Sequence, residues 1–212
     1  MDNQAKYKFA YALTSVASTG LSFVQDSLTS MMNDATDLSR LRSFYILLSY
    51  NFELLLKSRI VMTENFANKQ AMNSRLIELG HDIQTIANTL GNSTLAEIGI
   101  AKVENGLGQY KITTTDNKNI LIENFTRIRY DFLDNIMRTV GSREHERIKE
   151  YVDILFSILI KIKRKMREQS RCRREQAAPF YNVLLKTARL CARTGWVGKH
   201  IQIRASGFLK ND

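Results

Sequence analysis

The chain has 212 residues, a formal net charge of +10, one proline and two cysteines. This length can bury a hydrophobic core, so the fold needs no metal or disulfide framework. No apolar run approaches the roughly 20 residues of a membrane span, and the first residues lack a secretory pattern. Cys172 and Cys191 have no His or Cys beside them at zinc-ligand spacing. We therefore expect a cytoplasmic protein with reduced thiols, no cofactor and no membrane partner.

Apolar residues recur at steps of three and four along most of the chain, which predicts an all-α, up-and-down helical bundle. A first helix has its apolar stripe between residues 13 and 31, weakened by Gly20. A second, from residue 38 to about 56, has the broadest apolar face and is expected at the centre of the bundle. Glu53 and Lys57 stand one turn apart in it, so their pairing matters most if that face is buried.

A third helical segment covers about residues 73–90, with Gly80 interrupting it and Gly91 closing it. Near residues 110–123, β-branched residues flank the turn-like cluster "DNKN", which predicts a β-hairpin. We expect the hairpin to be a surface insertion, because two strands alone are marginally stable. The helical period returns from about residue 126 and continues through a long last helix whose stripe runs from Ile148 to Ile162.

The excess positive charge lies at the C-terminal end. Residues 1–160 have 17 basic and 18 acidic side chains, whereas residues 161–212 have 14 basic and 3 acidic ones. We divide the chain into a helical bundle domain, 1–168, and a basic C-terminal extension, 169–212, which is a mobile arm, a small helical addition or a segment foreign to the core. Such asymmetry favours a polyanionic partner, most often nucleic acid, or else is a solvated basic tail without a specific partner. The candidate nucleic-acid-binding residues are Lys161, Lys163, Arg164, Lys165, Arg167, Arg171, Arg173 and Arg174.

Three segments, in this order, resemble the HEPN superfamily of helical-bundle proteins, over about residues 38–165. "SYNFELLLKSRIV" resembles the family helix in which a Glu is followed by Leu-Leu-Lys, and includes Glu53 and Lys57. "ELGHDIQTIANTL" resembles the His-Asp segment that begins the next helix, with His81 and Asp82 in the matching places. The third is a late helix in which family nucleases have four to six residues between an Arg and a His. Arg138 and His145 have six between them.

The resemblance implies a homodimeric endoribonuclease of a toxin–antitoxin or antiviral defence system, with a cognate antitoxin or other defence partner. Its catalytic residues would be His145 as general base or acid, with Arg138 or Arg129 stabilising the phosphate. Histidine suits proton transfer near neutral pH, and arginine offers a fixed charge with a planar fork of donors. On one continuous helix, Arg138 and His145 would lie about 10 Å apart on the same face. This scheme needs no metal.

Other interpretations of the same residues stay open. Arg129-Tyr130 is similar to an Arg-Tyr found in family members with no following His, and would make this chain a catalytically inactive bundle that dimerises and binds nucleic acid or a partner protein. Arg75 and His81 also satisfy the Arg–His spacing, with five residues between them, but His81 already matches the second segment. Asp131 and Asp134 are spaced for one helix face and are expected to be solvated.

Supporting, structural roles are predicted for five residues: Glu53, Lys57, His81, Asp82 and Asp131.

Overall fold

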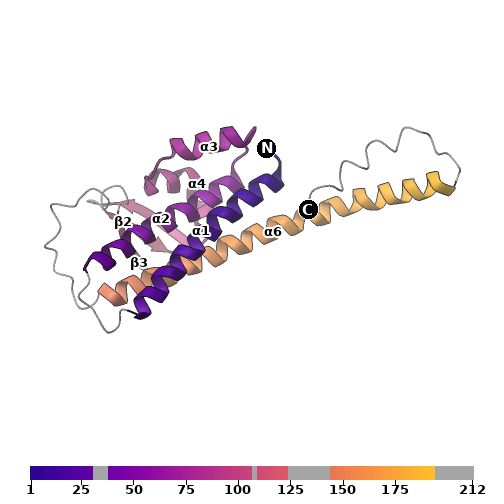
Figure 1. Ribbon diagram of the computed structural model, residues 1–212. Coiled ribbons are helices and arrows are strands. Elements are labelled where there is room, and N and C mark those ends of the chain that lie inside the picture. Colours follow the sequence, from indigo (N-terminus) through magenta and orange to yellow (C-terminus); the bar gives the residue numbers. More distant parts are fainter. Residues whose placement is uncertain (31–37, 107–108, 124–143, 194–212) are drawn as a thin grey trace. The chain divides into compact units, whose positions relative to one another are not determined.

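The computed structural model describes the backbone of residues 1–30, 38–106, 109–123 and 144–193, and the side chains of residues 1–30, 43–106, 109–122 and 145–169 (Figure 1). Its elements are α1 (Asn3–Ser30), α2 (Leu38–Thr63), α3 (Lys69–Glu78), α4 (Ile83–Glu97), β1 (Ile100–Asn105), β2 (Gln109–Thr114), β3 (Asn119–Glu123) and α6 (Glu144–Arg193). The chain divides into two compact units, Met1–Met166 and Arg167–Asp212. The following description concerns the first unit unless stated otherwise.

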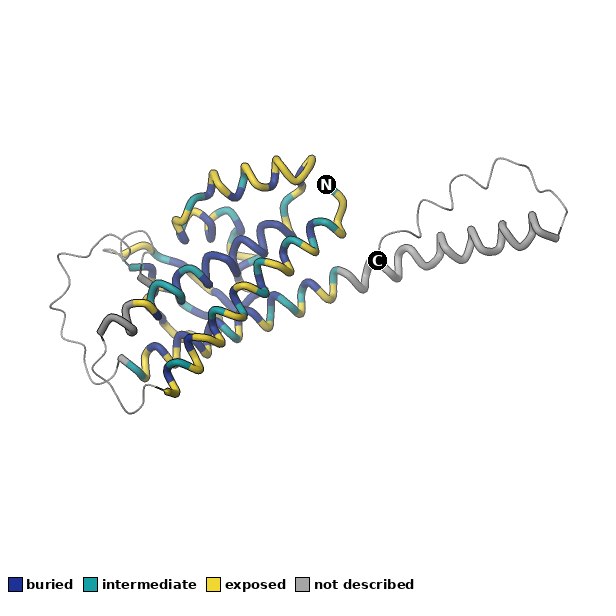
Figure 2. Tube along the Cα trace, viewed as in Figure 1, coloured by how far each residue is buried: buried dark blue, intermediate teal, exposed yellow. Residues whose placement is uncertain are grey.

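Helix α2 is the centre of the core, as its sequence predicts. Every residue from Asn51 to Met62 is buried (Figure 2). Helix α1 covers one side of α2 with a stripe that includes Ala17, Leu21 and Val24. The stripe predicted for the last helix, from Ile148 to Ile162, is likewise buried in α6. A helix that is apolar on all faces is stable only when other elements surround it, which is the position of α2.

A small antiparallel sheet, in the order β1-β2-β3, completes the first unit, so the fold is mainly helical and not purely α. The predicted hairpin is present as β2–β3, with Ile112 opposite Ile120 and a left-handed Asn117 in its turn. The remaining strand, β1, was not predicted. Tyr110, Ile112, Ile120 and Ile122 are fully or almost fully buried in the common core. The sheet is therefore part of the core and not a marginal insertion on its surface.

The predicted third helix, 73–90, is in fact two helices. Gly80 has a φ of 59° and lies in the turn between α3 and α4. Gly91, with a φ of 72° and a ψ of 159°, has a non-helical backbone, so the helical turns before it end there as predicted, and a second short helical part of α4 follows and ends at Glu97. Leu95, in this second part, is buried in the core.

The last predicted helical region, from about residue 126 onward, is described by the structure only in its later part. The helical period predicted from residue 126 falls largely in 124–143, outside the described residues. At the other end, the backbone of α6 continues as a helix through residues 169–193 of the predicted extension. Of the helices that the structure describes, none combines the length and the apolar character needed to cross a membrane.

Gly20 of α1 lies where α1 and α2 approach each other closely enough to exclude a side chain, so its replacement tests their packing. A Cβ at this position would lie 2.5 Å from both terminal atoms of the buried Asn51 side chain on α2. Helix propensity alone would make Gly20→Ala stabilising by about 1 kcal/mol. We expect a net destabilisation of about 1–3 kcal/mol, because the core must shift to admit the methyl group.

Urea denaturation of Gly20→Ala and of Thr19→Ala, on the exposed side of the same turn, measures this effect. Thr19→Ala should stay within about 0.5 kcal/mol of the parent. A Gly20→Ala variant more stable than the parent would contradict the close approach of α1 and α2.

Candidate functional site

The site begins with a carboxylate inside the core. The side chain of Glu53 on α2 is only 3% exposed, and Lys57, one turn later, donates from Nζ to Glu53 Oε1 over 2.8 Å. An isolated charge buried this deeply would be strongly destabilising, so each side chain of the pair needs the other to neutralise its charge. The sequence predicted this pair from its i, i+4 spacing and from the apolar helix around it.

His81 reaches the same carboxylate from the turn between α3 and α4. Its Nδ1 lies 2.9 Å from Glu53 Oε2 and 3.2 Å from Oε1. The left-handed Gly80 turns the chain immediately before it. The His81 side chain is nevertheless 54% exposed, although its Nδ1 contacts the buried carboxylate.

The bond to Glu53 determines which ring nitrogen of His81 has the proton. A carboxylate that is ion-paired with Lys57 is ionised, and an ionised carboxylate can only accept hydrogen bonds. Nδ1 must therefore be the donor. In the neutral ring, the lone pair is then on Nε2, the nitrogen on the far side of the ring from Glu53.

Asp82 holds the next residue of this turn in place. Its carboxylate caps α4 by accepting from the backbone amides of Gln84 and Thr85, and it also accepts from the hydroxyl groups of Thr85 and Tyr110. The Tyr110 bond, 2.7 Å long, ties the start of α4 to strand β2. Partial burial raises the pKa of Asp82, but the four hydrogen bonds outweigh it, and the pKa is lowered from its ordinary value.

A second buried charge lies further along α2. Arg59 is 3% exposed and donates from Nη2 to Glu97 Oε2 over 2.7 Å, while Lys165 of α6 lies 3.9 Å from the same oxygen. Burial lowers the pKa of the Arg59 guanidinium, although Glu97 opposes the shift. Sequence reasoning missed this network, because Glu97 is 38 residues from Arg59 and lies beyond the glycine expected to end its helix.

The predicted catalytic residues are only partly described. Arg129, Arg138 and Asp131 lie in 124–143, outside the described residues. His145 is the second residue of α6 and is half-buried. Arg75, the alternative arginine, is bound to Glu64 at 3.4 Å and to Glu78 at 3.0 Å.

His145 and the Glu53–His81 contact occupy different levels of the bundle. Tyr45 of α2 packs edge-on against Tyr151 of α6, with 6.4 Å between the ring centroids. Fourteen residues later in each helix, Arg59 of α2 and Lys165 of α6 both lie close to the carboxylate of Glu97. The two helices therefore run in parallel. His145 precedes Tyr151 whereas Glu53 follows Tyr45, and their offset of fourteen residues corresponds to about 21 Å along the axis.

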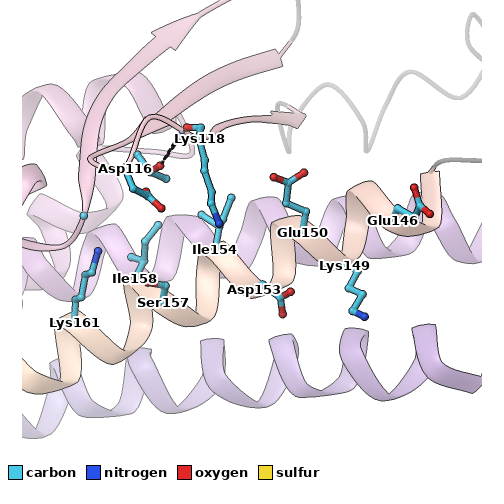
Figure 3. A pocket seen from close by; sticks show the side chains of 12 residues that line it. Asp116, Lys118, Glu146, Lys149, Glu150, Asp153, Ile154, Ser157, Ile158 and Lys161 are labelled. Atoms are coloured by element: carbon cyan, nitrogen blue, oxygen red, sulfur yellow. Dashed lines mark hydrogen bonds between the residues drawn. The ribbon is translucent and has the colours of Figure 1, made fainter.

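A groove of about 320 Å³ lies beside the first turns of α6, facing the β2–β3 turn (Figure 3). Its charged lining is mixed and includes the carboxylates of Asp116, Glu146, Glu150 and Asp153 and the ammonium groups of Lys118, Lys149 and Lys161. Hydrogen bonding to Thr114 is the main reason that the pKa of Asp116 is lowered. With carboxylates this numerous, the groove does not favour a polyanion.

The basic residues predicted to bind RNA all belong to α6. Lys161 lines the groove, Lys163 donates to Ser18 Oγ over 3.5 Å, and Lys165 is close to Glu97. Arg164 and Arg167 are exposed. Arg171, Arg173 and Arg174 belong to the helical backbone of α6, but their side chains are outside the description.

No group of three or more His, Cys, Asp and Glu side chains that could hold a metal ion occurs among the residues described. Comparison of the chain with protein-family models, curated proteins and solved structures finds no match. The contacts among Glu53, Lys57, His81, Asp82 and Tyr110 are therefore the main observation on which a functional proposal can be based.

The Tyr110–Asp82 bond predicts a pH-dependent stability. Tyr110→Phe should lower the free energy of unfolding at pH 7 by about 1 kcal/mol, since it removes one hydrogen bond to a carboxylate. Folding lowers the pKa of Asp82 below 3.8. The stabilisation is therefore present above that pH and is lost as the pH falls through the folded-state pKa.

Urea denaturation of both proteins at pH 7 and at pH 3 measures this difference. We expect the deficit of Tyr110→Phe to shrink at the lower pH. An equal deficit at both pH values would show that the hydroxyl does not act through the carboxylate.

Proposed function

We propose that this chain is a metal-independent endoribonuclease of HEPN type, acting as a homodimer. The observation that carries the proposal is the contact between the first two HEPN-like segments. Glu53 and Lys57 of the first form one hydrogen-bonded cluster with His81 of the second, across 28 residues of sequence. The resemblance rests on these side chains, and their assembly around one buried carboxylate favours a shared fold over a chance match.

The reaction proposed is attack of a ribose 2′-hydroxyl on the adjacent phosphate. A histidine takes the proton from the 2′-oxygen as the bond to phosphorus forms, and the bond from phosphorus to the 5′-oxygen breaks. The 5′-oxygen takes a proton from water, which leaves a 2′,3′-cyclic phosphate and a 5′-hydroxyl, and the protonated histidine returns its proton to water. By resemblance, His145 serves as this base, and Arg138 or Arg129 stabilises the charge on the phosphate.

The basic residues of α6 would supply affinity without sequence preference. Arg164 and Arg167 are exposed, and the helix continues through Arg171, Arg173 and Arg174. Each phosphate that such residues neutralise releases counterions, so binding weakens steeply with salt. These residues would retain RNA without selecting the cleavage position.

Incubation of the purified protein with end-labelled RNA in the presence of a chelator tests the proposal. We expect cleavage to products with cyclic phosphate ends, and a loss of about 10²–10⁴-fold in rate for His145→Ala. Glu146→Gln, which changes the exposed neighbour of His145, is the matched control and should cut normally.

RNA that is retained at low salt, released at high salt and never cut would reject the nuclease. That outcome would favour the alternative function, a catalytically inactive bundle that binds nucleic acid or a partner protein. Cleavage that stops in chelator would contradict the metal-independent mechanism.

A further inference from the structure

We infer that Tyr11 of α1, with Lys8 and Lys163 flanking it, forms a binding surface for single-stranded RNA. The inference rests on the proposed function, because both require RNA as the partner. It goes beyond that function by naming a side chain that stacks on an unpaired base. This side chain lies outside the basic C-terminal part of the chain to which the sequence assigned RNA binding.

Tyr11 is an exposed aromatic side chain on a fixed support. It is 54% exposed. One turn earlier in α1, the partly buried Tyr7 packs against the core, and the two rings lie nearly parallel, 16° apart with 6.4 Å between their centroids. Rings in this arrangement attract each other. Tyr7 therefore restricts the Tyr11 ring, which reduces the entropy lost when a base stacks on it.

Two ammonium groups flank Tyr11 along α1. Lys8 is exposed and precedes Tyr11 by three residues, so it lies on a neighbouring part of the helix surface. Lys163 of α6 donates to Ser18 of α1, with Nζ 3.5 Å from Oγ. Ser18 follows Tyr11 by seven residues, which puts this ammonium group on the same face of α1, about 10 Å along the axis. A strand that stacks a base on Tyr11 therefore has a lysine for its phosphates in each direction.

The combination of a ring with cations indicates the kind of partner. Bases stack on an aromatic side chain while the phosphates bind nearby cations, and only a single strand offers both at once. In a duplex the faces of the bases are covered by their neighbours, so Tyr11 has no base to contact except at an end. The basic residues of α6 attract either form through its phosphates. Tyr11 therefore supplies a preference for unpaired RNA that those residues lack.

Fluorescence anisotropy with labelled RNA that has 2′-O-methyl riboses tests this inference. The proposed reaction cannot cut such RNA, because its 2′-oxygens have no proton to lose, so binding is measured apart from cleavage. We expect the parent protein to bind the single strand more tightly than the same strand annealed to its complement. Tyr11→Ser should weaken binding of the single strand about 5–150-fold and leave binding of the duplex unchanged.

Two variants are matched controls for Tyr11→Ser. Tyr11→Phe keeps a ring that can stack, and it should bind both forms as the parent does. Phe23→Ser removes another exposed ring of α1, 58% exposed, which lies about 140° around the helix from Ser18. It should leave both affinities unchanged. All three variants should unfold at the urea concentration of the parent, because the side chains they replace are exposed.

Lys163→Gln separates the contribution of charge from that of stacking. A glutamine can still donate to Ser18, but it has no charge to offer a phosphate. We expect it to weaken binding of the single strand and of the duplex alike. The slope of log affinity against log salt should become shallower by about 0.7–0.9.

The outcomes distinguish this inference from the proposed function. If Tyr11→Ser binds the single strand as tightly as the parent, or loses affinity for both forms equally, the inference is wrong, and cleavage of unmodified RNA by the parent would still support the nuclease. If binding depends on Tyr11 but the parent leaves unmodified RNA uncut, the nuclease is wrong and the inference stands. A parent that neither binds nor cuts RNA removes both.

Discussion

The structure depends on one buried carboxylate. Glu53 lies in the part of α2 that is buried on all sides, where an unpaired charge would be strongly destabilising. Lys57 pairs with it from the same helix, and His81 binds it from the α3–α4 turn. Asp82, the next residue, then binds Tyr110 of the sheet. The requirement to satisfy Glu53 thus fixes the turn that joins the helices to the sheet.

The sequence predicted the helices better than their junctions. The period of apolar residues located α1, α2 and α6, and the turn cluster located the β2–β3 hairpin. Strand β1 was missed because its register shifts between Ile100 and Lys102, so its buried residues Ile100 and Val103 are three apart, a helical and not a strand spacing. The sequence located the break in α4 at Gly91, but not the short helical part beyond it, which ends at Glu97 and contains the buried Leu95.

For the site, the sequence identified the partners but not their contact. The spacing of Glu53 and Lys57 predicted their pair, and the HEPN resemblance drew attention to His81 and Asp82. Nothing in the sequence indicated that the His81 side chain would point toward Glu53 and not toward Arg75. The direction of the chain at His81 is set by the turn at Gly80, which sequence spacing does not reveal. His145, at a different level of the bundle, remains the residue indicated by the resemblance alone.

The tautomer of His81 is the most direct measurement of this account. Nitrogen NMR of the imidazole ring in the intact protein, above the pH at which the ring loses its charge, reports which nitrogen has the proton. A ring held by Glu53 must have the proton on Nδ1, and the double replacement of Glu53 and Lys57 should change that resonance. A proton found on Nε2 in the parent protein would contradict the donation from Nδ1 to Glu53, and with it the central role of this carboxylate.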